Sequence, residues 1–361
     1  MPQIKIATFN TEWMILLFGG QWSKWKSPEM PASHAGGRVG YNPSTPKIAD
    51  CNALSERLAQ VITNLNAQII GLQEAPPLKE QMEVFVHRYL KDEYIVYHSN
   101  ADWQSVSSLV HVSIADQVSA WMPALPNLGD MWKNIPYYPW GAITEAQRDT
   151  HTMKRKPLML TFTPAFGKSL HLMVIHTKSK ISKLTAAKWK KRDPEAVADA
   201  LDARMKLSCE AMRTRKFLDR LLESDPNPIS VMMMGDMNDG PYAEELEEQF
   251  LVHNILDELC GTMLYPDAHF RHAMSAATLR TAASTHFEDA LNAGVIINEL
   301  IDHMVVSPAI WQGTGDFRLV PDSCQVESAI WQAACAPEGP DAGRQFRPSD
   351  HMPVSTWLEW D

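Results

Sequence analysis

Short apolar runs recur along the whole chain and alternate with polar segments. A run of about four to eight residues rich in Val, Ile, Leu and Met, bounded by turn residues, is typical of a buried strand. We expect strands at residues 4–9, 69–74, 94–98, 108–114, 118–121, 156–163, 169–176, 229–234, 301–307 and 351–360.

Apolar residues at helical spacing predict helices at 52–66, 79–90 and 243–250. A longer amphipathic helix follows residue 192, and its apolar face is expected to carry Leu201, Met205, Cys209 and Met212. Strands and helices alternate without an internal repeat or an interdomain linker. We therefore predict one α/β domain over residues 1–361, in which two mixed sheets pack face to face with helices outside.

Three segments lack the apolar pattern of a strand and that of a helix, and we expect them to be insertions. They lie at about 13–50, 123–150 and 178–198. A loop as long as the first is usually a functional lid or disordered, and its Trp22 and Trp25 either stack on bases or pack the loop onto the body. The third opens with a basic run, residues 178–192, which has seven Lys or Arg, one tryptophan (Trp189) and no acid. That run either follows a phosphodiester backbone or is a solvated helix face.

The composition is that of an ordinary globular protein, with 45% hydrophobic and 21% charged residues. The net charge of −10 argues against a protein whose whole surface grips nucleic acid, although it leaves room for a local basic patch. The five cysteines form no Cys-x-x-Cys pair, so we expect reduced core residues. The N-terminal residues lack the regions of a signal peptide, and Met14–Phe18 is too short to span a bilayer, so we expect a cytoplasmic protein.

Polar residues stand where several of the apolar runs end or begin. They are Asn10, Glu12, Glu74, His176, Asp236, Asn238, Asp302, Asp350 and His351. A strand end holds a side chain rigidly at the edge of a sheet, where a ligand can reach it. Carboxylates, amides and imidazoles in that setting are typical of a site that binds a hard cation and moves protons.

Each of these residues also has a structural interpretation. Asp236 and Asn238 precede Asp239-Gly240-Pro241, which is good turn chemistry. An EF-hand loop is excluded because Gly240 and Pro241 fall at its fifth and sixth positions and a strand precedes it. His176 is as compatible with a core histidine as with a catalytic one, and Arg155, just before the run at 156–163, with a surface charge as with a phosphate clamp.

Taken together, four segments in this order resemble the endonuclease/exonuclease/phosphatase superfamily. They are Thr8-Phe9-Asn10-Thr11-Glu12, Gly71-Leu72-Gln73-Glu74, Gly235-Asp236-Met237-Asn238 and Ser349-Asp350-His351, and Ile301–Ser307 adds a fifth piece. The resemblance spans residues 4 to 361. It implies a four-layer α/β sandwich with the active site at one end of the two sheets.

The resemblance also implies a role for each candidate residue. Glu74 would hold Mg²⁺ or Mn²⁺, with Glu12 and Asp350 nearby and Asn10 supporting; the position of Glu12 is Asp in some members. His351, oriented by Asp302, would be the base or would hold the attacking water. Asp236 would deprotonate the nucleophile or protonate the leaving oxygen. The phosphate and its developing charge would be held by Asn238, His176 and Arg155.

The substrate is less determined than the chemistry. We favour a nuclease that cleaves phosphodiesters of DNA or RNA. The alternatives are a phosphomonoesterase, a phospholipase C-like enzyme, and a non-catalytic binding module on the same fold. The Trp-Cys-Asp-Arg signature of inositol phosphatases is absent, which disfavours a phosphoinositide. A zinc hydrolase has only the neighbouring His269 and His272 in its favour. The oligomeric state is not predicted.

Overall fold

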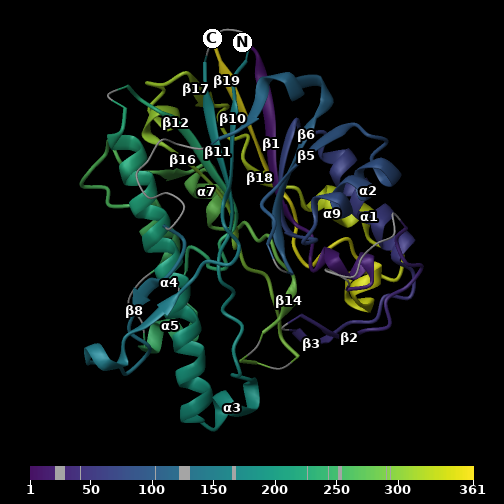
Figure 1. Cartoon of the computed structure of the whole chain (residues 1–361), viewed down its shortest axis with the longest axis vertical. Coiled ribbons are helices and arrows are strands. Elements are labelled where there is room, and N and C mark those ends of the chain that lie inside the picture. The colour runs from purple at the N-terminus through teal and green to yellow at the C-terminus, as the bar shows by residue number, and fades with distance from the viewer. Residues whose placement is uncertain are drawn as a thin grey trace.

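The structure is a computed structural model. It describes the chain except residues 21–28, 41, 102, 122–130, 165–167, 226, 243, 251–253, 290 and 293. Two mixed sheets lie at the centre of the molecule, with helices on both outer faces (Figure 1). This arrangement confirms the predicted fold class, a four-layer α/β sandwich.

The first sheet contains the two ends of the chain. Its strands run in the order β17 (Phe317–Leu319), β19 (Val354–Trp360), β1 (Gln3–Asn10), β4 (Ile69–Ala75), β6 (Ser105–His111) and β5 (Tyr94–His98), and β18 (Gln325–Val326) also pairs with β19. β1 and β4 are parallel, whereas β1 and β19 are antiparallel. The remaining pairs are antiparallel.

The second sheet has a similar plan. Its strands run in the order β13 (Arg271–His272), β16 (Asp302–Val306), β12 (Ser230–Asp236), β11 (Leu170–His176), β10 (Leu158–Phe162) and β7 (Val118–Ala120). β11 and β12 form the parallel pair, and the other pairs are antiparallel.

The inner faces of the two sheets share one apolar core, in which Ile6, Ile69, Met234 and Met304 are fully buried. The sheets approach closely at Gly71 in β4. A Cβ atom at that position would lie 2.7 Å from Val174 Cγ1 of β11. Glycine is therefore required for this packing.

Helices close the two outer faces over separate cores. The first sheet is covered by η1 (Met14–Phe18), α1 (Cys51–Leu65), α2 (Lys79–Tyr89) and α9 (Ser328–Ala334). The second is covered by α4 (Pro194–Glu223) and α6 (Ile255–Cys260). The remaining elements are α3 (Ala186–Lys190), α5 (Glu245–Phe250), α7 (Ala276–Leu279), α8 (Pro308–Trp311), η2 (Val112–Gln117), η4 (Glu145–Gln147), η5 (Pro340–Ala342) and η6 (Arg344–Phe346).

Two sequence predictions about these elements were wrong in detail. The predicted apolar face of α4 is one of them. Leu201 is buried, but Met212 is 43% exposed, and the buried side of the helix runs through Leu207, Ala211 and Leu218. The methionine spacing was misleading because small alanines line the buried side. β6 begins earlier than the predicted 108–114, since its buried serines make the start of the strand look polar.

The predicted insertions add small elements at one end of the molecule. The hairpins β2 (Gly37–Val39) with β3 (Asn42–Thr45) and β8 (Ile135–Tyr137) with β9 (Asp149–His151) lie away from both chain ends, as does α3 (Figure 1). A further hairpin outside these insertions, β14 (Phe287–Glu288) with β15 (Ile296–Ile297), lies at the same end. η1 is buried in the core, so the described start of the first insertion is part of the body rather than a loose lid. Trp22 and Trp25 lie outside the described residues. In the described part of the chain, no helix has the length and apolar character needed to cross a bilayer.

Candidate active site

The topology brings strand ends from both sheets to one edge of the molecule. The parallel strands β1, β4, β11 and β12 end there, and the antiparallel strands β16 and β19 begin there. In the second sheet Asp236 pairs with both His176 and Asp302. In the first, the Ser349 hydroxyl donates to the Asn10 carbonyl at 2.7 Å, across a separation of 339 residues. The predicted site residues therefore converge.

The backbone at this edge is left-handed at four non-glycine residues. The φ angles are 46° at Glu12, 52° at Trp13, 56° at Glu74 and 50° at Asn238. At Glu74 the pairing between β4 and β6 also shifts its register, which is the signature of a β-bulge. Such conformations cost about 1–3 kcal/mol each and persist where the surroundings impose them, so they concentrate at functional sites.

The Asp236 carboxylate contacts several of the other site residues. Its Oδ2 accepts a hydrogen bond from Asn10 Nδ2 at 2.8 Å, and its Oδ1 accepts one from the Asn238 backbone N–H at 2.8 Å. His176 Nε2 lies 3.5 Å from Oδ2. Burial raises the pKa of Asp236 to about 6, against the partial opposition of the His351 charge. Asp236 is thus a buried carboxyl group whose raised pKa suits proton transfer.

The strand geometry that presents Asp236 depends on Gly235. This residue has φ of +143°, and a Cβ there would lie 1.9 Å from the Ile175 carbonyl oxygen. No L-residue with a side chain fits without moving β11. Glycine is therefore needed directly before Asp236.

His351 forms a close pair with Asp302, as the sequence suggested. His351 Nδ1 lies 2.7 Å from Asp302 Oδ2, which also accepts a hydrogen bond from the Ser284 hydroxyl at 2.8 Å. Burial opposes protonation of His351, but the Asp302 carboxylate outweighs it and raises the pKa of His351 well above its ordinary value. The pKa of His176 is instead well below its ordinary value, because of burial and the nearby positive charges of Arg155 and His351. These opposite shifts favour an imidazolium at His351 and a neutral ring at His176.

Glu74 and Asp350 are carboxylates without a full set of partners. Glu74 Oε2 accepts the Trp13 backbone N–H at 2.6 Å, and burial together with the Asp350 charge raises the pKa of Glu74 to about 7. Asp350 Oδ1 is buried and has no hydrogen-bond partner among the described residues. Two partly buried carboxylates that repel each other are a good fit for a hard divalent cation, which would neutralise both.

Glu12 lies beside Asp350, but its oxygens are already engaged. Oε2 accepts the Asp350 backbone N–H at 2.7 Å and lies 3.3 Å from Arg344 Nε, while Oε1 accepts a hydrogen bond from Arg347 Nη2 at 3.4 Å. Asn10 is similarly committed, since its Oδ1 accepts the Glu12 backbone N–H at 3.0 Å. These two residues are placed to support the cation ligands rather than to offer a free oxygen.

The sequence interpretation missed Arg344, which ties the site together. Its guanidinium donates to the backbone carbonyls of Thr11 and Glu12 on one side, and to those of Arg347 and Pro348 on the other. The only signal in the sequence was a pair of arginines just before Asp350. Their role depends on long-range contacts that spacing does not reveal.

A second group could also hold a cation. Asp236, Asp302 and His351 offer ligand atoms that lie within 4.8 Å of one another. However, the Asp302 oxygen that faces His351 is hydrogen-bonded to it, and both Asp236 oxygens accept hydrogen bonds from amides, so Asp302 Oδ1 is the one carboxylate oxygen of this group without a partner among the described residues. The repulsion between Glu74 and Asp350, which a cation would relieve, favours that pair as the cation site.

Arg155 and Asn238 both reach the loop that leaves β11. Arg155 donates through Nη2 to the Thr177 carbonyl at 2.6 Å and through Nη1 to Gln104 Oε1 at 2.8 Å. Asn238 Nδ2 donates to the same Thr177 carbonyl at 3.2 Å. Because its acceptors are neutral, Arg155 keeps its full charge at the edge of the site.

Several other candidates are not part of this constellation. His269 contacts the Gly261 carbonyl and His272 contacts His303, and neither belongs to a group of described residues that could hold a metal. In the basic run, Lys180 is largely buried and its Nζ lies 2.5 Å from Asp239 Oδ1. Trp189 is only 5% exposed, so it packs the insertion rather than offering a face to a base.

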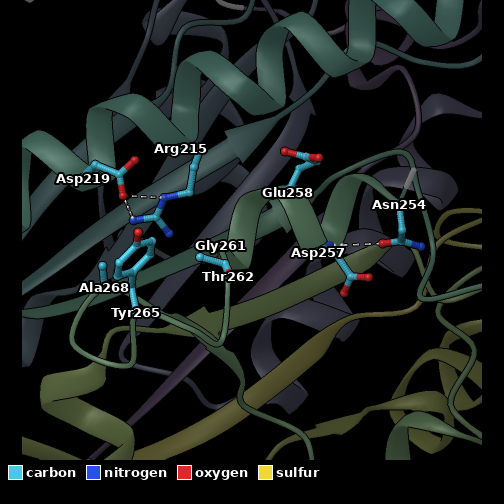
Figure 2. A pocket seen from close by; sticks show the side chains of 9 residues that line it. All are labelled: Arg215, Asp219, Asn254, Asp257, Glu258, Gly261, Thr262, Tyr265 and Ala268. Atoms are coloured by element: carbon cyan, nitrogen blue, oxygen red, sulfur yellow. Dashed lines mark hydrogen bonds and ion pairs between the residues drawn. The ribbon is translucent and has the colours of Figure 1, made fainter. Parts of the chain in front are cut away.

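A separate surface hollow of about 620 Å³ lies between α4 and the loop after α6 (Figure 2). Arg215 reaches into it and pairs with Asp219 at 2.7 Å, while Tyr265 closes one side. It contains none of the residues that converge at the strand ends. We therefore assign the chemistry to the edge of the sheets and not to this hollow.

Comparison with protein family models and with curated proteins gives no match. Among solved structures, the chain is similar to a mannosyl-6-phosphatase from Bacteroides thetaiotaomicron, at 12% identity over 99% of this chain and 100% of that one, with a TM-score of 0.49. It is also similar to an endonuclease/exonuclease/phosphatase from Bacteroides vulgatus, at 13% identity over 100% of both chains and a TM-score of 0.48. A third is TDP2 from D. rerio, complexed with single strand DNA product, at 12% identity over 99% and 100% of the two chains and a TM-score of 0.48.

Proposed function

We propose that this protein is a metal-dependent phosphoric ester hydrolase that cleaves phosphodiesters, with a nucleic acid as its favoured substrate. One observation carries the proposal: a carboxylate pair suited to a divalent cation lies beside a proton-transfer group. The carboxylate pair is Glu74 with Asp350, and the proton-transfer group is Asp236 with the His351–Asp302 pair. Metal-assisted hydrolysis of a phosphate ester uses both functions at one point.

Glu74 and Asp350 would hold Mg²⁺ or Mn²⁺, which supplies a Lewis acid for a phosphoryl oxygen. Arg344 and Glu12 would keep these carboxylates in place through the contacts between β1 and the segment before β19. Such supporting contacts tune a metal site nearly as strongly as the ligands themselves.

Asp236 would accept the proton of the attacking water. Hydrogen bonds from Asn10 and Asn238 fix its carboxylate in the edge of the sheet. His351, held by Asp302, would carry a proton at Nε2 and direct it toward the phosphate. Neutral His176 would donate to an oxygen that gains charge in the transition state, and the nearby Arg155 charge would favour that oxygen through space.

The cytoplasm is the compartment that we propose for this activity. All five cysteines are free thiols in the structure, and three of them are buried. Free thiols are typical of a reducing compartment.

Hydrolysis assays test the proposal directly. Bis(p-nitrophenyl) phosphate and p-nitrophenyl phosphate would be compared with Mg²⁺, with Mn²⁺ and with a chelator, on the native chain, Asp236→Asn and Asp302→Asn. We expect diester turnover that a chelator abolishes and that falls by about 10²–10⁴ in either variant, as loss of an acid–base group does. Asp116→Asn is the matched control, since Asp116 is exposed and lies in η2.

Other outcomes redirect the assignment. Turnover of the monoester alone would make the protein a phosphatase. Native rates in both aspartate variants would refute the assigned roles. No metal-stimulated hydrolysis of any phosphate ester would favour a binding module on this fold.

A further inference from the structure

Arg155 and Lys178 are two cations beside the proposed active site that form no ion pair with any carboxylate in the described ranges of the chain. They meet at the loop that leaves β11. Arg155 donates to the carbonyl of Thr177, the residue directly before Lys178. His176, at the end of the same strand, belongs to the catalytic edge.

Lys178 has nearby acidic residues, but their oxygens have other partners. Its backbone N–H donates to Glu210 Oε2 at 2.6 Å, and the other Glu210 oxygen lies 2.7 Å from His151 Nε2. The ammonium group itself donates to the carbonyl of Ser179. Burial, followed by the Arg155 charge, lowers the pKa of Lys178 to about 8. The ammonium is thus held half-buried beside another cation without a counter-ion in contact.

Arg155 is fixed in place but not neutralised. Its two hydrogen-bond acceptors, Gln104 Oε1 and the Thr177 carbonyl, are both neutral. Its charge also acts on the edge that carries the proposed active site, since it contributes to the low pKa of His176 and partly offsets the rise in the pKa of Glu74. The guanidinium is therefore near the proposed site as well as near Lys178.

Other buried or partly buried cations in this region are neutralised. Lys180, two residues further along, lies 2.5 Å from Asp239 and 2.6 Å from Glu244. Arg204 pairs with Glu247 at 3.2 Å, and Arg347 with Glu12 at 3.4 Å. In a chain with a net charge of −10, two adjacent cations without such a partner indicate that the anion comes from outside.

We propose that Arg155 and Lys178 form a subsite for a second anionic group of the substrate, a phosphate next to the one that is cleaved. The inference rests on the proposed function and adds a substrate requirement to it. The second phosphate has two possible sources, a neighbouring phosphodiester of a nucleic acid strand or a terminal monoester of a smaller molecule. A substrate with a single phosphate leaves the subsite empty.

Matched substrates with one or two phosphates test this requirement. They are bis(p-nitrophenyl) phosphate, the dinucleotide TpT, its 5′-phosphorylated form pTpT, and the trinucleotide TpTpT. Each would be assayed on the native chain, on Lys178→Met and on Lys178→Arg, which keeps the charge. Lys183→Met is the control, because Lys183 lies in the same segment, is 68% exposed and lies 4.0 Å from Asp199.

We expect the native chain to prefer the substrates with two phosphates by tenfold or more in kcat/KM. Lys178→Met should lose about tenfold on those substrates, chiefly through KM, and far less on bis(p-nitrophenyl) phosphate, while Lys178→Arg should recover most of the loss. Stimulation by pTpT alone identifies a terminal monoester as the second group, and stimulation by TpTpT as well identifies a strand. A native chain without this preference, or an equal loss on every substrate, would overturn the inference.

Failure of the proposed function gives a different result, namely no hydrolysis of any substrate, including bis(p-nitrophenyl) phosphate. In that case calorimetric titration with pTpT still tests the subsite. Binding that is tenfold weaker in Lys178→Met than in the native chain and in Lys183→Met would support the subsite. Equal affinities would overturn it.

Discussion

Replacing Glu74 with glutamine removes a negative charge that destabilises the metal-free folded protein. The pKa of Glu74 rises from an ordinary 4.5 to about 7 because of burial and the nearby Asp350 carboxylate. As the pH rises, the unfolded chain therefore releases this proton before the folded chain does. The stability that the neutral carboxyl provides is complete below pH 4.5 and is lost as the pH rises through about 7.

The size of the effect follows from proton linkage. Between pH 5 and pH 8, the two pKa values imply that Glu74 lowers the free energy of unfolding of the metal-free protein by about 2.5 kcal/mol. The neutral amide of Glu74→Gln avoids that cost. A bound cation offsets it too, so Mn²⁺ should stabilise the native chain more at pH 8 than at pH 5.

Urea unfolding at pH 5 and pH 8, in chelator and in Mn²⁺, measures these quantities. We expect Glu74→Gln to gain stability relative to the native chain as the pH rises in chelator, and to lose most of the stabilisation by Mn²⁺. Glu83→Gln is the matched control, since Glu83 lies on α2 with its side chain 51% exposed. If the variant and the native chain differed by the same amount at both pH values, the reasoning about Glu74 would be refuted.

Two further predictions concern the support of the site. Arg344→Lys should weaken Mn²⁺ binding by about 10–100-fold, as loss of a contact that orients metal ligands does, because lysine cannot bridge the carbonyls on both sides of Glu12 and Asp350. Titration followed by electron paramagnetic resonance measures it, and native affinity would contradict the role of Arg344. Gly235→Ala should lower the free energy of unfolding by about 3 kcal/mol or more, since its Cβ would collide with the Ile175 carbonyl. Urea unfolding would detect this loss, and native stability would show that β11 can shift.

The fold class was predictable because most strands have a strong local signal. Apolar runs such as 169–176 and 229–234 form buried strands, and helical periodicity gave α1 within one residue at each end. The apolar face of α4 was not predictable in the same way. Its buried side includes Arg204, whose pairing with Glu247 depends on tertiary contacts.

Part of the candidate active site was also predictable, because some of its residues have a strong local signal. Polar residues at strand ends, such as Asp236 and Asp302, stand out against apolar neighbours, and the structure places them side by side. The surroundings of Glu12 did not stand out, because Arg344 and Arg347 reach it from more than 330 positions away in the chain. Lys178 was hidden in a basic run whose members have different environments in the structure.

The pairing of β1 with β19 has a consequence for biosynthesis. Asn10 contacts Ser349 across 339 residues, which a ribosome needs roughly 20–70 s to add at 5–20 residues per second. The core under α1 and α2 draws nearly all its residues from the first third of the chain, so it can condense early in translation. The edge that carries the proposed active site cannot, because Asp350 and His351 are added after all its other residues. Enzymatic activity on a stalled nascent chain should therefore appear only after β19 has left the ribosome.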